Sequence, residues 1–251
     1  STKIQPRPAG DIGPGCTDIW NHAGRHFFAV GAFEARVKSV SRVSASMSAA
    51  KVLRSGLAEI GLELDSGTQQ KLLAYLALMR KWNRTYNLTA ISDENEMVIH
   101  HVLDSLAVLP NLWSGKWLDV GCGAGVPGAI LAIARPGWRF TLLDSNSKKT
   151  SFVQQAAIEL GLSNVTVYTG RVEDWGTSDR FDGIISRAFA DLRKFTQLTE
   201  HLLAEEGRWV AMKGKLEDEL PQGRKVVGRI PIHVPGLNAV RSLVIAAKIR
   251  E

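Results

Sequence analysis

The chain is poor in cysteine and lacks a long apolar run. Its 251 residues include only Cys16 and Cys122, a pair too sparse for a disulfide framework and without metal-ligand spacing. We therefore predict no metal site and a reducing, cytoplasmic setting. No apolar stretch approaches the roughly 20 residues that a membrane-spanning helix needs, so we expect no membrane partner.

The charge balance is only mildly basic. Lys and Arg number 31 against 25 Asp and Glu, which gives a net charge of +6. Half of this surplus lies in residues 1–46, with six basic and three acidic residues, and half in the remainder, with 25 and 22. The balance is compatible with a nucleic-acid substrate but does not require one.

Residues 1–46 differ from the rest of the chain. Prolines and glycines crowd the start, serines crowd positions 39–46, and no helical or strand period is visible. Basic residues among serines suggest a transit peptide, whereas a vector-derived leader or a mis-assigned start would make Met47 the native first residue. Because Asp11, Asp18 and Glu34 are atypical of transit peptides, we favour the second interpretation.

The remaining residues, 47–251, are predicted to form one domain. Residues 47–110 are typical of a helical segment, whose last helix begins at a capping box of Asp93 and Glu96. In residues 111–251 strands and helices alternate, which predicts a parallel sheet covered on both faces. The predicted strands are 116–120, 139–144, 165–169, 181–186 and 207–213, and the predicted helices are 93–109, 127–134, 147–160 and 191–205.

The end of the chain predicts an antiparallel hairpin. Two apolar runs near 225–234 and 240–249 follow each other without a helix between them. Pro231 and Pro235 place the first of these strands at an edge of the sheet, because proline donates no ladder hydrogen bond. We therefore expect a mostly parallel seven-stranded sheet that is closed by this hairpin.

A glycine-rich turn is the most informative motif. Residues 117–128 read Trp-Leu-Asp-Val-Gly-Cys-Gly-Ala-Gly-Val-Pro-Gly, a strand that enters a turn before a helix. Asp144 ends the next predicted strand, 23 residues after Gly121. Glycines let backbone amides approach a ligand, and an acid at the neighbouring strand end can accept hydrogen bonds from both ribose hydroxyls. The pair predicts a nucleoside-containing cofactor.

The details of the turn favour S-adenosylmethionine over a dinucleotide, although residues 123–128 also match G-x-G-x-x-G. Asp119 stands where a carboxylate can meet the methionine ammonium, directly or through water, and it has no obvious use beside a pyrophosphate. Pro127 removes an amide that a pyrophosphate would bind. The C-terminal hairpin is common in methyltransferases as well. Together these features predict a Rossmann-like class I methyltransferase fold with a helical segment at its N-terminus.

The other predicted strand ends supply further candidates. Glu173 and Asp174 follow the third strand and suit an adenine amino group beside the Val172 backbone, or they only begin a surface loop. Arg187 ends the fourth strand and is expected to point into the cleft rather than to form a surface salt bridge. Lys213 ends the fifth strand and is either an RNA phosphate contact or a solvated charge.

Residues that are missing from the predicted site limit which kind of atom can accept the methyl group. Methylation at a pyrimidine C5 uses a cysteine nucleophile, and Cys122 lies within the cofactor turn. Methylation of an exocyclic amine usually uses an Asn/Asp-Pro-Pro-aromatic tetrad, where this chain has residues 186–189, Ser-Arg-Ala-Phe. A ring nitrogen such as guanine N7 needs neither device, because position and charge balance suffice.

Polar residues also gather in the helical segment. Asp104 lies one turn from His100 and three residues from His101, so a helical His–Asp pair is feasible. One interpretation is a helix that docks on the sheet with these side chains hydrogen-bonded across the seam. The other is direct contact with the substrate.

Seven motifs in order resemble the GidB family of bacterial small-subunit rRNA guanine-N7 methyltransferases. The likeness covers about residues 47–251, and the leader is not part of it. The motifs are residues 81–83 with 86–89, 101–106, 118–128, 142–145 with 148–149, 170–173, 186–188 and 212–214. Cys122 and Val126 depart from the usual family residues without putting the turn in doubt.

The resemblance implies a cytoplasmic enzyme that uses S-adenosylmethionine to methylate one guanine of 16S rRNA, in the free RNA or the 30S subunit. Candidate cofactor residues, including those of the turn, are Asp119, Gly121, Gly123, Gly125, Val126, Asp144, Val172, Glu173 and Arg187. Candidate substrate-side and catalytic residues are Asn87, His101, Asp104, Arg187 and Lys213, so Arg187 stays open between the two roles.

Two further expectations concern partners. A basic patch around the cleft mouth is expected to bind RNA, and it comprises Lys148, Lys149, Arg187, Arg193, Lys194 and Lys213. Nothing in the sequence suggests a large exposed apolar face, so we expect a monomer. A small-molecule methyltransferase of the same fold and a non-catalytic RNA-binding protein remain the rival functions.

Overall fold

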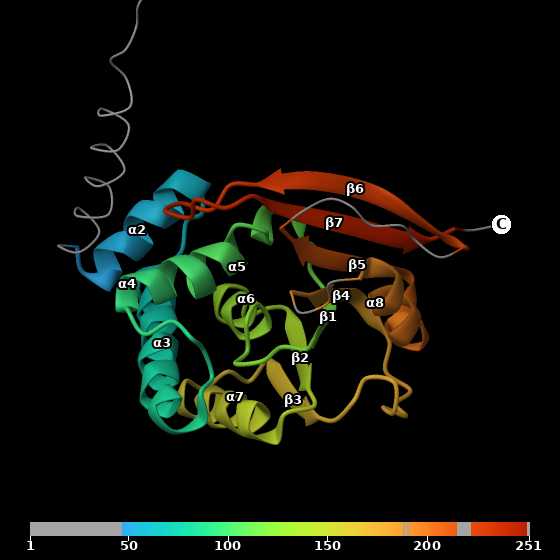
Figure 1. Ribbon diagram of the computed structural model, residues 1–251, viewed down its shortest axis with the longest axis horizontal. Helices are drawn as coiled ribbons and strands as arrows, with labels where there is room; N and C mark the ends of the chain where they lie inside the picture. The colour runs from blue at the N-terminus through green and yellow to red at the C-terminus, as the bar shows by residue number, and fades with distance from the viewer. Residues whose placement is uncertain (1–46, 188, 190, 215–221, 250–251) are drawn as a thin grey trace, which may run out of the picture. The chain divides into compact units, whose positions relative to one another are not determined.

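The computed structural model describes residues 47–187, 189, 191–214 and 222–249. The predicted leader, residues 1–46, lies outside these residues. The described part contains a seven-stranded sheet with strand order β3-β2-β1-β4-β5-β7-β6 (Figure 1). The strands are β1 (Lys116–Val120), β2 (Arg139–Asp144), β3 (Val165–Thr169), β4 (Phe181–Ser186), β5 (Leu203–Lys213), β6 (Arg224–Ile232) and β7 (Arg241–Lys248).

The sheet confirms the predicted Rossmann-like fold. Strands β1 to β5 run parallel, whereas β7 pairs antiparallel with both β5 and β6. The hairpin therefore closes the sheet, and β6, which contains Pro231, is its outermost strand as predicted. The chain leaves β3 for the opposite side of β1, so the strand order switches between β1 and β4. Ligands of open α/β sheets bind at the carboxyl ends of the strands beside such a switch.

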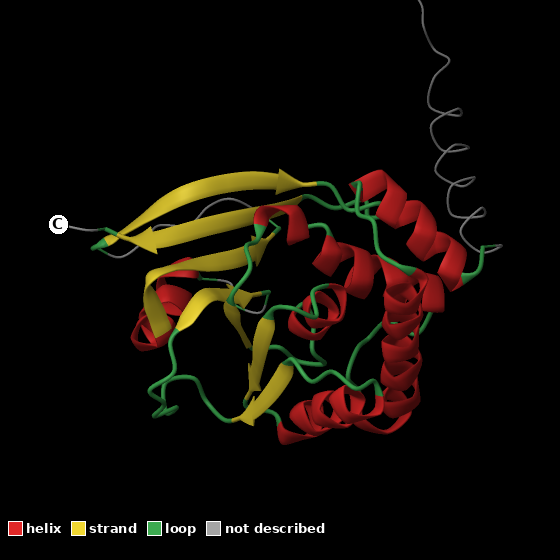
Figure 2. Cartoon of the chain, turned by 180° about the vertical axis from the view of Figure 1, so that it is seen from behind, coloured by secondary structure: helices red, strands yellow, loops and turns green. Residues whose placement is uncertain are grey.

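Helices cover both faces of the sheet (Figures 1 and 2). On one face α6 (Gly128–Ala134) and α7 (Ser147–Glu159) share a core with the helical segment, and α8 (Leu192–Thr199) packs on the other face. Alternate residues of β1 divide between the two cores: Trp117 joins the first and Leu118 the second. No helix in the described ranges is long and apolar enough to span a membrane.

The helical segment packs against α6 and α7. It consists of α2 (Ala49–Ile60), α3 (Ser66–Tyr86), α4 (Glu94–Met97), the π-helical turn η1 (Val98–Leu103), α5 (Asp104–Leu106) and the 3-10 turn η2 (Leu109–Asn111). The Asp93 carboxylate accepts the Glu96 N–H at 2.9 Å and caps α4 as predicted. The predicted helix 93–109 is thus helical as far as Leu106, with a π turn in its middle.

The helix predicted over 191–205 is too long. Helix α8 ends at Thr199, a 3-10 turn, η3 (Glu200–Leu202), follows, and β5 already begins at Leu203. Gly207 follows the predicted helix at a position typical of a helix end, but it lies inside β5. A Cβ at Gly207 would stand 2.7 Å from the Phe181 carbonyl oxygen, so the glycine allows a close approach of β4 at an irregularity of the ladder.

Candidate active site

Three adjacent cavities follow the carboxyl edge of the sheet. The Asp144 cavity is bounded by the ends of β1 and β2, residues 170–173 and α8. The glycine-loop cavity lies between residues 121–126 and the helical segment, and it shares Gly121 with the Asp144 cavity. The arginine cavity shares His101 and Arg187 with the glycine-loop cavity, and its lining is Ile91, His100, His101, Asp104, Arg187, Met212, Lys213, Gly214 and Arg241.

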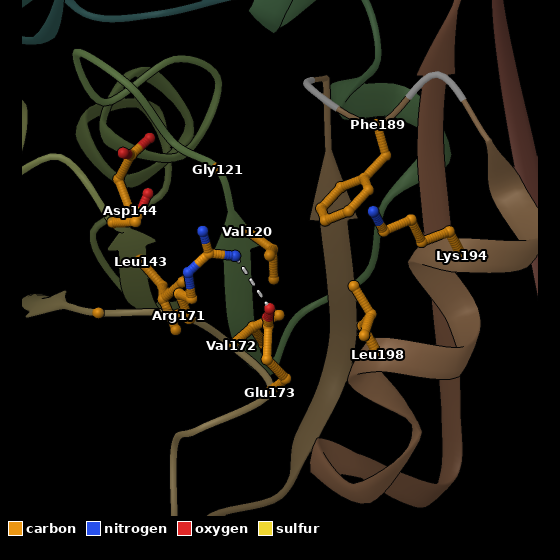
Figure 3. A pocket seen from close by; sticks show the side chains of 12 residues that line it. Val120, Gly121, Leu143, Asp144, Arg171, Val172, Glu173, Phe189, Lys194 and Leu198 are labelled. Carbon is orange, nitrogen blue, oxygen red and sulfur yellow. Dashed lines mark hydrogen bonds and ion pairs between the residues drawn. The ribbon is translucent and has the colours of Figure 1, made fainter.

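Side chains from two sides line the Asp144 cavity (Figure 3). Asp144, Arg171 and Glu173 lie on one side, and the Phe189 ring, Leu198 and the Lys194 side chain lie on the other. The Arg171 guanidinium pairs with the Glu173 carboxylate at 3.3 Å. The pKa of Glu173 is lowered, first by a hydrogen bond from its own backbone N–H, so this carboxylate is ionised at neutral pH.

Asp144 combines a structural role with spare acceptor capacity. Its Oδ2 accepts the Gly123 N–H at 2.8 Å, and its Oδ1 accepts the Asn146 N–H at 2.8 Å. A carboxylate offers about four acceptor positions, so each oxygen retains one for a ligand. The same side chain can therefore shape the glycine turn and receive two ligand hydroxyls.

Tyr75 holds the glycine turn through a buried hydrogen bond. This fully buried tyrosine of α3 donates its hydroxyl to the Ala124 carbonyl at 2.9 Å, and burial raises its pKa, which keeps the donor protonated. Gly125 has φ 76°, and a Cβ there would stand 2.1 Å from the Tyr75 hydroxyl oxygen. Gly125 is therefore required for loop packing and, unlike Gly121 and Gly123, does not line the cavities.

Replacing Tyr75 with phenylalanine should loosen this support. The variant leaves the buried Ala124 carbonyl without its partner, which typically costs about 1–3 kcal/mol. We expect a lower midpoint of thermal unfolding and a several-fold weaker affinity for S-adenosylmethionine, measured by calorimetry. The exposed Tyr86→Phe variant is the matched control. Equal affinities for Tyr75→Phe and the unmodified protein would show that the turn does not depend on this contact.

Asp119 lies beneath the turn rather than in a cavity. Its side chain is 0% exposed, its Oδ2 accepts the Gly128 N–H at 2.8 Å, and its Oδ1 has no partner among the described residues. Burial raises its pKa to about 7. Of the two expected contacts with a methionine ammonium, the covered carboxylate does not support the direct one, and the contact through water stays a prediction. Glycine at 128 lets the helix backbone approach so closely that the carboxylate is covered.

A buried carboxylate joins two arginines at the arginine cavity. Asp104 is 2% exposed and accepts from Arg187 Nη1 at 3.1 Å and from Arg241 Nε at 3.0 Å. Arg187 Nη1 also donates to the His100 carbonyl, at 3.0 Å, within the π turn. The helical His–Asp pair that the spacing allows is therefore not formed. Asp104 instead bonds across the seam to Arg187 and Arg241, as the docking interpretation expects for this side chain.

The two histidines of the π turn face different surroundings. His100 pairs with Glu96 at 3.1 Å on a half-exposed surface. His101 is buried, and its Nε2 lies 3.0 Å from the Thr89 hydroxyl. Burial, and next the positive charge of Arg187, lower the pKa of His101 to about 4. His101 is therefore neutral at physiological pH where it lines two cavities.

The structure brings most of the predicted site residues together. Val172, Glu173 and Asp144 line the first cavity, Gly121, Gly123 and Val126 line the second, and His101, Asp104, Arg187 and Lys213 line the third. Asn87 is an exposed exception that lines none of the three. It adopts φ 49° as the left-handed C-cap of α3, a position that asparagine tolerates.

Arg241 is the main site residue that the sequence analysis missed. It begins β7, far from every motif, and only the hairpin topology returns it to the end of β4. Thr89 lies inside a quoted motif and Phe189 lies in the quoted stretch 186–189, but neither residue had a predicted role. Of the predicted basic patch, Lys149, Arg187, Lys194 and Lys213 line the cavities, whereas Lys148 and Arg193 do not.

The fold and the arrangement of the site define a Rossmann-like methyltransferase. A solved structure of similar fold is the glycopeptide N-methyltransferase MtfA in complex with S-adenosyl-L-methionine, with a TM-score of 0.50 and 13% identity over 60% of this chain and 88% of that chain. At this identity the likeness concerns the fold alone.

Sequence comparison narrows the class to one family. The family model described as rRNA small subunit methyltransferase G, GidB, matches residues 68–238. The ribosomal RNA small subunit methyltransferase G of Chromobacterium violaceum is 52% identical over 76% of this chain and 94% of its own length. The enzyme of the same name from Neisseria meningitidis serogroup A is 50% identical over 78% of this chain and 97% of its own length. The chain belongs to this family.

Proposed function

We propose that this protein transfers a methyl group from S-adenosylmethionine to N7 of one guanine in the 16S rRNA of the small ribosomal subunit. Family membership supports rRNA methylation, and the continuous line of three cavities supports a two-substrate site. The observation that carries the proposal is Arg187, which lines both the glycine-loop cavity and the arginine cavity. One residue thus stands between the cofactor side and the acceptor side.

The three cavities suggest an order of ligand groups. The Asp144 cavity suits the adenosine, since Asp144 has two spare acceptor positions and Phe189 offers a ring across from it. The glycine-loop cavity then suits the methionine portion, with the Lys149 cation available for its carboxylate. The arginine cavity, at the ends of β4 and β5, is left for the acceptor nucleotide.

The chain needs no general base for this reaction. S-adenosylmethionine supplies an electrophilic methyl group, and guanine N7 has a free lone pair and carries no proton that a base would have to remove. The residues of the site therefore have to position the acceptor and balance charge. Cationic Arg187 presents donors at the boundary of the two cavities, where they can hold the O6 acceptor of a guanine while its N7 lone pair stays free for the methyl group.

The proposal is tested by methyl transfer to RNA and to small molecules in parallel. Radiolabelled S-adenosylmethionine is incubated with 30S subunits that lack the modification, with free 16S rRNA and with a panel of metabolites. We expect label in the RNA and none in the metabolites. Label only in metabolites would favour a small-molecule enzyme, and a failure to bind S-adenosylmethionine by calorimetry would favour a non-catalytic protein.

Three further parts of the proposal concern the location of the protein, its oligomeric state and its independence of a metal ion. We infer that it acts in the cytoplasm, where its ribosomal substrate is made, and that it acts as a monomer without a metal ion. Sedimentation at micromolar concentration should give the mass of one chain, and chelators should leave methyl transfer unchanged. A stable dimer, or activity that chelators abolish and added metal restores, would contradict this part.

A further inference from the structure

We propose that Arg241 is a substrate-binding residue that forms, with Arg187, a clamp for a backbone phosphate of the acceptor strand, and that Asp104 is the positioning residue that holds both arginines. The inference rests on the proposed function, because it assigns the ligand of the acceptor side. It concerns a residue from the C-terminal hairpin that no signature motif contains.

The geometry of the clamp comes from one buried carboxylate. Its two oxygens take one arginine each: Asp104 Oδ2 binds Arg187, and Oδ1 binds Arg241. The Asp104 side chain is 2% exposed, whereas those of Arg187 and Arg241 are 32% and 29% exposed. The carboxylate is thus covered while both guanidinium groups reach the cavity.

Both guanidinium groups keep donors for a ligand. Arg241 uses Nε for Asp104 and Nη1 for the Val240 carbonyl, at 3.3 Å, and Arg187 uses Nη1 for its two protein acceptors. A guanidinium carries five N–H donors, so several remain on each side chain. Two planar donor groups fixed around one cavity match the oxygens of a phosphodiester.

The charge of the cavity also favours an anion. Arg187 and Arg241 contribute two positive charges, their shared partner Asp104 contributes one negative charge, and His101 is neutral. This cluster therefore carries a surplus of one positive charge. A neutral base alone would not balance this surplus, whereas the phosphate of its nucleotide would. The cavity encloses about 380 Å³, which gives room for more than an ion.

The first test removes the charge of Arg241. In Arg241→Gln we expect kcat/KM for 30S subunits to fall about tenfold and the slope of its logarithm against the logarithm of salt concentration, between about 50 and 200 mM, to become shallower by about 0.7. Affinity for S-adenosylmethionine should stay unchanged, because Arg241 lines neither the Asp144 cavity nor the glycine-loop cavity. Arg241→Lys should keep the slope and raise KM, because it keeps the charge and loses the planar fork.

A matched control removes a charge elsewhere on the hairpin. Lys225 is exposed on β6 and pairs with Ala247, near the opposite end of β7 from Arg241. Lys225→Gln should leave both kcat/KM and the salt slope unchanged. An Arg241→Gln variant that folds and shows the salt slope and KM of the unmodified protein would overturn the clamp.

The second test separates positioning from charge. Asp104→Asn removes a negative charge, so electrostatics alone predicts tighter RNA binding. The positioning role predicts the opposite: KM for 30S subunits should rise several-fold, although the cavity has become more positive. Thermal unfolding confirms that the variant is folded at the assay temperature. Tighter binding of 30S subunits by the folded variant would refute the positioning role.

A third measurement is independent of methyl transfer. With S-adenosylhomocysteine bound, calorimetry should show that guanosine 5′-monophosphate binds more tightly than guanosine, and that Arg241→Gln removes this preference. If the proposed function is wrong, the unmodified protein will transfer no methyl group to RNA. If the clamp hypothesis is wrong, the nucleotide and the nucleoside will bind equally, whether or not methyl transfer occurs.

Discussion

Replacing Asp144 with alanine should abolish the binding of S-adenosylmethionine. The side chain supplies the two free acceptor positions of the Asp144 cavity, and it also holds the turn through the N–H groups of Gly123 and Asn146. Hydrogen bonds to charged groups contribute about 1.5–3 kcal/mol each. The loss of two ribose contacts therefore predicts a decrease in affinity of at least about 100-fold. Calorimetric titration of the variant with S-adenosylmethionine measures it.

Two variants make the result specific. Asp174→Ala removes a nearby acid that lines none of the three cavities, and it should leave the affinity unchanged. Asp144→Asn keeps one acceptor oxygen and should fall between the alanine variant and the unmodified protein. Near-normal affinity of Asp144→Ala would show that the adenosine binds elsewhere.

Replacing Asp119 with asparagine should stabilise the ligand-free protein, and more so as the pH rises. Burial raises the pKa of this carboxyl from 3.8 to about 7. The folded protein therefore holds a proton that the unfolded chain releases, so stability is fully present below about pH 4 and is lost as the pH rises toward 7. The shift corresponds to about 4 kcal/mol, which asparagine avoids because it carries no charge.

The expected difference between Asp119→Asn and the unmodified protein is therefore close to zero near pH 4 and largest above pH 7. Urea unfolding at pH 4, 6 and 8 measures it. A variant that is less stable than the unmodified protein at pH 8 would contradict this expectation, because it would mean that the ligand-free fold stabilises the charged carboxylate.

The shifted pKa of His101 has the opposite effect on the pH dependence of stability between about pH 4 and 6.5. Its pKa falls from 6.5 to about 4, so its contribution to stability is present above pH 6.5 and is lost as the pH falls toward 4. Between these values the two groups offset each other in the unmodified protein. The Asp119→Asn variant should consequently show a steeper loss of stability on acidification than the unmodified protein does.

Local sequence signals were sufficient for strands β1 to β4 and for the glycine turn with Asp144. Strands β1 to β4 begin and end where the apolar runs do, and the turn with Asp144 is a contiguous pattern whose spacing reflects one strand–helix–strand unit. The end of α8 was not predictable in this way. A glycine such as Gly207 is typical of a helix end. Here, however, glycine is needed because the backbone of β4, which is distant in sequence, lies too close for a side chain.

The acceptor half of the site depends on tertiary structure. Asp104 and His101 were visible as a polar cluster, but whether Asp104 bonds a histidine of its own helix or an arginine of the sheet depends on the π turn and on docking across the seam. Arg241 had no local signal, because an arginine before an apolar strand is common. Only the pairing of β7 with β5 brings it to the cavity.

The most direct test of the account is nucleoside analysis of 30S subunits after methyl transfer. Subunits that lack the modification are labelled with radioactive S-adenosylmethionine, digested to nucleosides and separated. The account predicts that all label elutes as 7-methylguanosine and maps to one position of 16S rRNA. Label in another methylated nucleoside, or no label in RNA while S-adenosylmethionine binding is intact, would contradict it.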